Sequence, residues 1–139
     1  MGTRSAVFYK TKEGDFKGSY IHWDGYIEGV GIMLQTYYRD KKVIKKLVDT
    51  SSFYRSLLKT VKDTVRDTLE GTVGIEKDHY RAGTLEDILA YGEESDLEYI
   101  YVFIDDGFLV SYGNYADYEK SFKEFCLLED LIADSRPKE

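Results

Sequence analysis

The residues with the clearest chemical potential stand together: His22, Trp23, Asp24, Gly25 and Tyr26 read HWDGY and include the only tryptophan and one of the two histidines of the chain. An imidazole exchanges a proton near neutral pH, and a carboxylate two residues away could orient or charge it. A hydrolase or transferase built on His22 and Asp24 would also need a nucleophile. No nearby serine or tyrosine has a context that marks it as one.

Two other interpretations of this segment stay open. In the structural one, Asp24 and Gly25 make the turn between a strand and a helix, while Trp23 fills the core and the imidazole is hydrogen-bonded. In the binding one, five side chains line a pocket for a nucleotide-like ligand. We favour the structural interpretation over catalysis, and the ligand pocket lies between the two. The candidate ligand-binding residues are Arg4, His22, Trp23, Asp24 and Tyr26.

Three glycines, Gly25, Gly29 and Gly31, follow the same strand and precede a helix, where backbone N–H groups could receive a phosphate. Their spacing does not match a dinucleotide fingerprint, and Glu28 would repel a phosphate. A tight strand-to-helix turn explains the glycines equally well.

Other catalytic and metal-binding patterns are missing from the sequence. It has no Walker-type phosphate loop, no GxSxG elbow and no HExxH motif. The single cysteine, Cys126, rules out an intramolecular disulfide and is expected on the apolar stripe of a helix as an inert core thiol. Two distant histidines are a poor ligand set for zinc. We therefore expect no metal, no cofactor and no enzymatic activity.

Two hairpins are the clearest elements that would position these residues. Short apolar runs at residues 5–10 and 16–23 are joined by a polar, glycine-containing turn. The runs at residues 98–104 and 108–112 flank Asp-Asp-Gly, a favourable turn because Asp and Gly tolerate positive φ. Apolar residues on both faces of the first of these runs indicate a central strand.

Outside the two hairpins, most of the sequence has the hydrophobic periodicity of helices. Asp40 and Thr84 are predicted N-caps. Residues 71–83 have no clear period and predict a loop or a short irregular strand. The fold class is therefore α+β in a single domain over residues 1–139, with an approximately four-stranded, mainly antiparallel sheet and four or five helices. The predicted helices span residues 30–38, 41–48, 51–70, 85–92 and 115–134.

Charge is divided unevenly along the 139 residues, whose net charge is −7. Residues 1–83 carry 15 basic against 11 acidic residues, whereas residues 84–135 carry 2 against 14. The acidic part would repel nucleic acid and attract basic surfaces, although a solvated face that maintains solubility is equally compatible with it. The candidate partner-binding residues are Glu86, Asp87, Glu93, Glu94, Asp96 and Glu98.

Basic residues gather on the predicted helix over residues 41–48, which carries Lys41, Lys42, Lys45 and Lys46 on one face. These lysines could meet phosphates. A solvated helix face is the commoner explanation and the one we favour.

Two motifs resemble a group of small phage and prophage proteins of unassigned function. These are the GTRSA opening at residues 2–6 and HWDGY-x-x-GVG at residues 22–31, followed by a helix that ends near Tyr38-Arg39-Asp40. The resemblance covers residues 2–48 well and extends weakly to the hairpin at residues 98–112. It implies an origin on a mobile element and does not imply a mechanism.

Together these observations favour a non-enzymatic interaction protein. The leading hypothesis is an inhibitor of a bacterial defence effector, such as a nuclease, whose nucleic-acid groove the acidic half would occupy. The partner is then a host protein, with no direct nucleic-acid binding and no membrane segment, and the location is the host cytoplasm. The alternative is a module that sequesters a nucleotide-like signal. A small hydrolase that uses His22 and Asp24 comes third.

Overall fold

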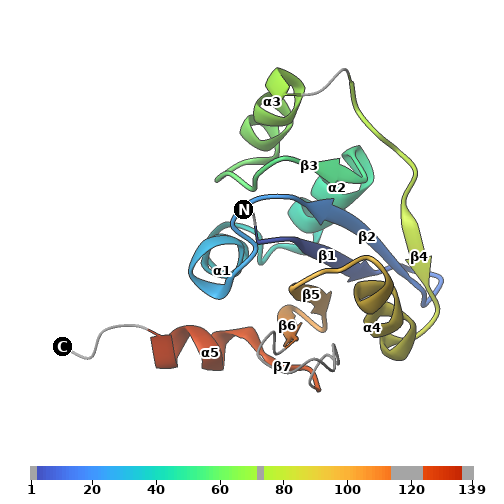
Figure 1. Ribbon diagram of the computed structural model, residues 1–139, viewed down its shortest axis with the longest axis vertical. Helices are drawn as coiled ribbons and strands as arrows, with labels where there is room; N and C mark the ends of the chain where they lie inside the picture. Colours follow the sequence, from blue (N-terminus) through green and yellow to red (C-terminus); the bar gives the residue numbers. More distant parts are fainter. Residues whose placement is uncertain (1–2, 72–73, 114–123, 136–139) are drawn as a thin grey trace.

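A computed structural model describes residues 3–71, 74–113 and 124–135, and its centre is one mixed β-sheet (Figure 1). Within these residues the sheet has seven strands in the order β3-β2-β1-β5-β6-β7, with β4 paired to β2. The expectation of about four mainly antiparallel strands was therefore wrong, although the α+β class holds. The strands are β1 (Ser5–Lys10), β2 (Phe16–Ile21), β3 (Phe53–Tyr54), β4 (Tyr80–Ala82), β5 (Tyr99–Ile104), β6 (Gly107–Tyr112) and β7 (Cys126–Leu127).

Both predicted hairpins are present. β1 pairs with β2, and β5 pairs with β6, each antiparallel. In the second hairpin the positive φ angles belong to Asp105 (51°) and Asp106 (65°), while Gly107 begins β6. The two aspartates thus adopt the left-handed conformation that this turn needs.

Parallel pairing joins the hairpins and extends the sheet. β1 runs parallel to β5, and β2 runs parallel to β3. β3 and β4 share the outer edge of β2, where they pair with its last and first residues respectively. These contacts connect segments that are distant in the sequence, so the local patterns that predicted the hairpins did not reveal them.

Five α-helices accompany the described strands, and a π-helical turn, η1 (Ile27–Gly31), leads into the first. Asp40 and Thr84 cap α2 and α4 as predicted, because their side chains accept hydrogen bonds from the amides of Lys42 and Asp87. The α-helices are α1 (Ile32–Tyr37), α2 (Lys41–Thr50), α3 (Val61–Gly71), α4 (Leu85–Glu94) and α5 (Leu128–Ser135).

Two predicted helices differ from the structure. The helix expected over residues 51–70 begins only at Val61, because Phe53 and Tyr54 join the sheet as β3. The helix expected over residues 115–134 is present from Leu128. Cys126 lies in β7, and residues 114–123 lie outside the described part.

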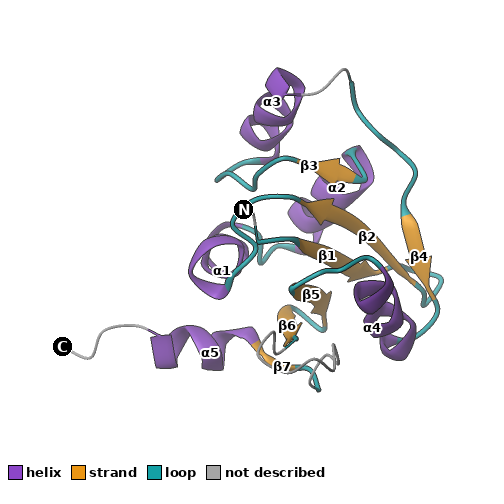
Figure 2. Cartoon of the chain, in the orientation of Figure 1, coloured by secondary structure: helices purple, strands orange, loops and turns teal. Residues whose placement is uncertain are grey.

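The sheet separates two apolar cores, because successive side chains of a strand point to opposite faces. Val7 and Tyr9 of β1 face the larger core, together with side chains from η1, α1, α2, α3 and α5. Ala6 and Phe8 face the smaller core, which α4 covers through Ile88. Figure 2 shows the helices placed around the sheet. The residues of α2 and α4 are therefore separated by the sheet.

Candidate functional site

One end of the sheet brings together residues that are distant in the sequence. Ser5 pairs with Ile21 of β2 and with Tyr99 of β5. The preceding residue, Arg4, therefore lies between His22 and Glu98, and its carbonyl accepts a hydrogen bond from the Glu98 amide at 2.9 Å. By the alternation of the strands these three residues share the sheet face that α4 covers.

His22 is held among aromatic side chains. Its Nδ1 lies 2.8 Å from the hydroxyl of Tyr20, and its ring meets the ring of Trp23 edge to face at 4.9 Å. Tyr20 in turn stacks on Phe53 of β3, with ring centroids 5.6 Å apart. We call Tyr20, His22, Trp23 and Phe53 the aromatic strip. The His22 amide donates to the carbonyl of Tyr54, the last residue of β3, and the Trp23 amide donates to the carbonyl of Arg55 just beyond it, which fixes the strip beside that strand.

The structural interpretation placed Trp23 in the core, and this part of it was wrong. Its side chain is 40% exposed, and Tyr26 three residues later is 37% exposed. Large aromatic side chains that stay in contact with water are the type of residue most enriched at protein interfaces. The strip is therefore a surface feature of the molecule.

Asp24 and Gly25 form the turn between β2 and η1. Asp24 has a φ of 59°, and its carbonyl accepts the Val30 amide at 2.8 Å. Gly25 donates its amide to Thr3, and a Cβ added to it would lie 2.6 Å from Cβ of Ser5. Only a glycine fits such a close approach.

The Asp24 carboxylate is directed to Tyr26 and not to His22. The Tyr26 hydroxyl donates to it at 3.3 Å, and the negative charge of Asp24 raises the pKa of that phenol. Within the described residues no hydrogen bond joins Asp24 to His22. The five candidate ligand residues thus divide into two groups, and a His22–Asp24 catalytic pair is not formed.

The glycine amides of this turn are already engaged. Gly29 and Gly31 both donate to the Tyr26 carbonyl, at 3.0 and 3.4 Å, and Gly25 donates to Thr3. Because these N–H groups have backbone partners, they are not available to a phosphate. The tight-turn explanation of the glycines fits the geometry.

The exposed side of α4 carries four carboxylates, which we call the acidic α4 face: Glu86, Asp87, Glu93 and Glu94. All four residues are exposed, and the ion pairs of the described residues involve none of them. Positions seven apart on a helix share a side, so Glu86 aligns with Glu93 and Asp87 with Glu94. Beyond the helix, Asp96 is exposed with a φ of 55°, whereas Glu98 is half-buried beside Arg4.

Tyr20 connects the acidic α4 face to the aromatic strip. Burial raises the pKa of Tyr20, the charge of Arg4 lowers it, and Tyr91 and Glu98 raise it, so all of these groups lie close to the phenol. Tyr91 belongs to α4, where its ring stacks on Tyr80 of β4 with centroids 4.0 Å apart. The aromatic strip therefore approaches α4 at Tyr20, on the sheet face opposite α2.

Four aromatic members of this surface were absent from the sequence-based candidates: Tyr20, Phe53, Tyr80 and Tyr91. Phe53 was assigned to a helix, and Tyr80 was placed in a segment without a clear period. The strand-forming pair Phe53-Tyr54 after two serines was the local signal that could have identified β3.

A metal centre has no support in the described part of the chain, where no three His, Cys, Asp or Glu side chains cluster. The Cys126 thiol is half-buried, and burial raises its pKa, which disfavours the reactive thiolate. Among the described helices none is long and apolar enough to cross a bilayer. In comparisons with known proteins, no family model, curated protein or solved structure matches the chain.

Proposed function

We propose that this protein is a non-enzymatic interaction protein that binds a basic surface of a host protein through the acidic α4 face and the adjoining aromatic strip. The observation that carries the proposal is their contiguity. Tyr91 of α4, the helix that carries four exposed carboxylates without ion pairs in the described part of the molecule, lies near Tyr20 of the strip. The strip also contains the exposed Trp23.

The division of labour within such a surface follows from general interface physics. An aromatic anchor supplies affinity where it becomes desolvated, and Trp23 with its neighbouring rings offers such an anchor. Exposed carboxylates on the rim steer a basic partner and repel acidic ones. Arg4, beside the strip, could pair with a carboxylate of the partner.

We further propose that the partner is a bacterial defence effector with a basic nucleic-acid groove. The support is the resemblance of residues 2–48 to phage and prophage proteins, together with the −12 balance of residues 84–135. A helix that presents carboxylates in place of phosphates would compete with nucleic acid for such a groove.

The experiment is a phage plating assay in bacteria that carry individual nuclease-based defence systems. Expression of the wild-type chain should restore plating in at least one system. Glu93→Lys/Glu94→Lys should abolish the rescue. The control Glu13→Lys/Glu70→Lys, which makes the same charge change at exposed positions outside α4, should retain it. Rescue that survives the α4 reversal would remove the acidic face from the proposal.

A second candidate is a small-ligand module centred on Arg4. Its side chain is half-buried beside His22 and makes no hydrogen bond or ion pair with other described residues. A cation next to stacked aromatic rings suits an anionic, nucleotide-like ligand. Thermal-shift measurements with nucleotides and cyclic nucleotides test this candidate, and an unchanged melting temperature at millimolar ligand would count against it.

A further inference from the structure

The sequence of α2 forces its lysines to one side. Ile44, Leu47 and Val48 are fully buried against the sheet, so the residues on the opposite side of the helix face away from it. Exposed lysines on a helix are commonly no more than a solvated face, and the periodicity alone favours that explanation. Their surroundings in the structure give these lysines a second possible role.

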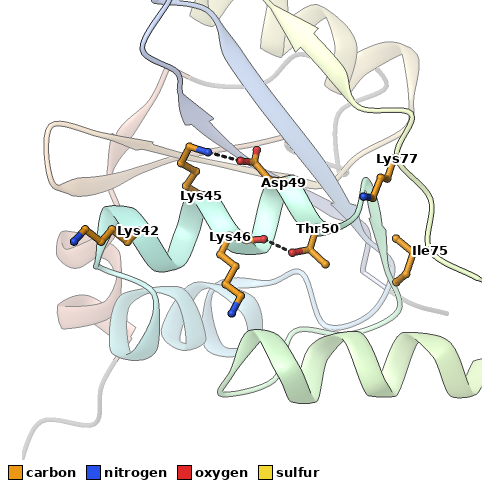
Figure 3. A pocket seen from close by; sticks show the side chains of 7 residues that line it. All are labelled: Lys42, Lys45, Lys46, Asp49, Thr50, Ile75 and Lys77. Carbon is orange, nitrogen blue, oxygen red and sulfur yellow. Dashed lines mark hydrogen bonds and ion pairs between the residues drawn. The ribbon is translucent and has the colours of Figure 1, made fainter.

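Three of the α2 lysines line a hollow of about 730 Å³ that is open to solvent. In Figure 3 the α2 side chains extend from the helix, whereas two others reach in from the segment that precedes β4. We call this site the lysine hollow, and its lining residues are Lys42, Lys45, Lys46, Asp49, Thr50, Ile75 and Lys77.

The segment that contributes Ile75 and Lys77 to the hollow is hydrogen-bonded to α2 and to the residues that follow it. The Ser52 amide donates to the Glu76 carbonyl at 2.8 Å, and Nε2 of His79 lies 2.5 Å from the Val48 carbonyl. These bonds hold the segment on both sides of Lys77. The fold therefore places Lys77 in the lining of the same hollow as Lys46 and Lys42, and in Figure 3 the Lys42 side chain extends from the far end of the helix, away from Lys77.

The one carboxylate in the lining is already neutralised. Asp49 accepts hydrogen bonds from Lys45 at 2.6 Å, Lys17 at 2.9 Å and Tyr9 at 2.8 Å. Lys42, Lys46 and Lys77 have no ion pair with any described residue. Three ammonium groups thus remain free to meet an anion.

Of three neighbouring hollows lined by described residues, the lysine hollow carries the most positive charge. The lysine hollow has a balance of +3, from four lysines and one aspartate. Two adjoining hollows have a smaller net charge. The first has a net charge of +1 and is lined by Arg39, Asp40, Lys41, Lys42 and Asp106. The second has a net charge of zero, and its charged lining residues are Lys10, Lys41, Asp105 and Asp106. A long polyanion would leave the basic site after a short distance and then meet carboxylates, in a molecule of net charge −7.

We infer that the lysine hollow binds a compact, multiply charged phosphate ligand, namely two or three linked phosphate groups such as those of a nucleoside diphosphate or triphosphate. Its lining contains no aromatic side chain on which a base could stack, so the recognised group is the phosphate chain. This site lies across the sheet from the acidic α4 face, and the inference does not depend on the proposed partner.

The test is calorimetric titration of the full chain with inorganic triphosphate at low ionic strength, without a divalent metal. We expect one site per chain. Lys42→Gln/Lys46→Gln should weaken binding at least tenfold, and Lys77→Gln, on the separate segment, should also weaken it. The matched control Lys12→Gln/Lys62→Gln removes the same charge from exposed positions outside the hollow and should bind like the wild type.

Each alternative result would overturn the inference. No binding by the wild type would do so, as would equal weakening by the control, because the latter would indicate general screening. Tighter binding of a single-stranded oligonucleotide than of triphosphate would assign the site to nucleic acid. Binding of a polyglutamate peptide as tight as that of triphosphate would assign it to an acidic protein segment. Melting temperatures of all variants establish that each is folded.

Discussion

Two buried serines differ in how their hydroxyl groups are satisfied. The Ser19 hydroxyl donates to the Ser51 carbonyl at 2.5 Å, with Val48 also in reach at 3.2 Å. The Ser5 hydroxyl, equally buried, has no hydrogen-bond partner among the described residues. Burial of an unpaired hydroxyl costs free energy, whereas a paired one contributes to stability.

Alanine substitution should therefore act differently at the two serines. Ser19→Ala is expected to lower the free energy of unfolding by about 1 kcal/mol or more, and Ser5→Ala to leave it unchanged or raise it. Urea denaturation of both variants measures the difference. A loss at Ser5 as large as that at Ser19 would mean that the Ser5 hydroxyl has a partner after all.

Asp49 links stability to pH. Burial alone would raise its pKa, but the hydrogen bonds from Lys45, Lys17 and Tyr9 outweigh burial and lower the pKa from 3.8 to about 2. Because the folded pKa is below the unfolded one, the ionised carboxylate stabilises the fold above about pH 4. That contribution is lost as the pH falls from about 4 to about 2.

Asp49→Asn is expected to lower the free energy of unfolding at pH 7 by on the order of 1 kcal/mol, because partial solvent exposure screens the ion pairs. At pH 2 the variant and the wild type should differ much less. Urea denaturation at both pH values measures the change, with the exposed Asp78→Asn as control. A deficit that stays constant down to pH 2 would contradict the ion-pair explanation.

Among the secondary-structure elements, those that depend on neighbouring residues could be predicted from the sequence. The Asp-Asp-Gly turn, the Thr84 cap and the apolar runs of β1 and β5 were all predictable, because each depends on neighbouring residues. β3, β4 and β7 have only two or three residues each, too few for a period. The parallel β1–β5 pair joins residues more than ninety positions apart, and no turn signal specifies it.

In the candidate site, too, the contacts between residues distant in the sequence could not be predicted. The register of the first hairpin was enough to expect Arg4 near His22, and the structure places them at the same end of the sheet. The partners of His22 could not be foreseen, since Phe53 arrives through β3 and Glu98 through β5. The exposure of Trp23 also followed from tertiary structure and not from its neighbours in the sequence.

The turn between β2 and η1 offers a test at this scale. In Gly25→Ala the new Cβ would lie 2.6 Å from both Cβ of Ser5 and the backbone oxygen of Thr3, so the strand-to-helix turn must shift. We expect a loss of about 2 kcal/mol or more. Gly107→Ala, where the added Cβ would meet nothing within 4 Å, is the control. Thermal denaturation that shows equal losses for both variants would contradict the close-approach argument.

At the scale of the whole molecule, the sheet separates two kinds of charge. α4 and Tyr20 of the aromatic strip lie on one side, and α2 with the lysine hollow lies on the other. An overall charge of −7 therefore conceals a basic site. The proposed host partner would bind on one side of the sheet and the proposed phosphate ligand on the other, so each can be tested without disturbing its counterpart.

Binding through the acidic α4 face and the aromatic strip is tested most directly by the affinity of the purified chain for the defence effector identified by plating, measured across a salt series. We predict that wild-type binding weakens as salt rises, because exposed charges act over about 8 Å at physiological ionic strength. Glu93→Lys/Glu94→Lys and Trp23→Ala should each weaken binding at least tenfold, while Glu13→Lys/Glu70→Lys should not. Wild-type affinity in both surface variants, with no dependence on salt, would contradict the assignment of this surface.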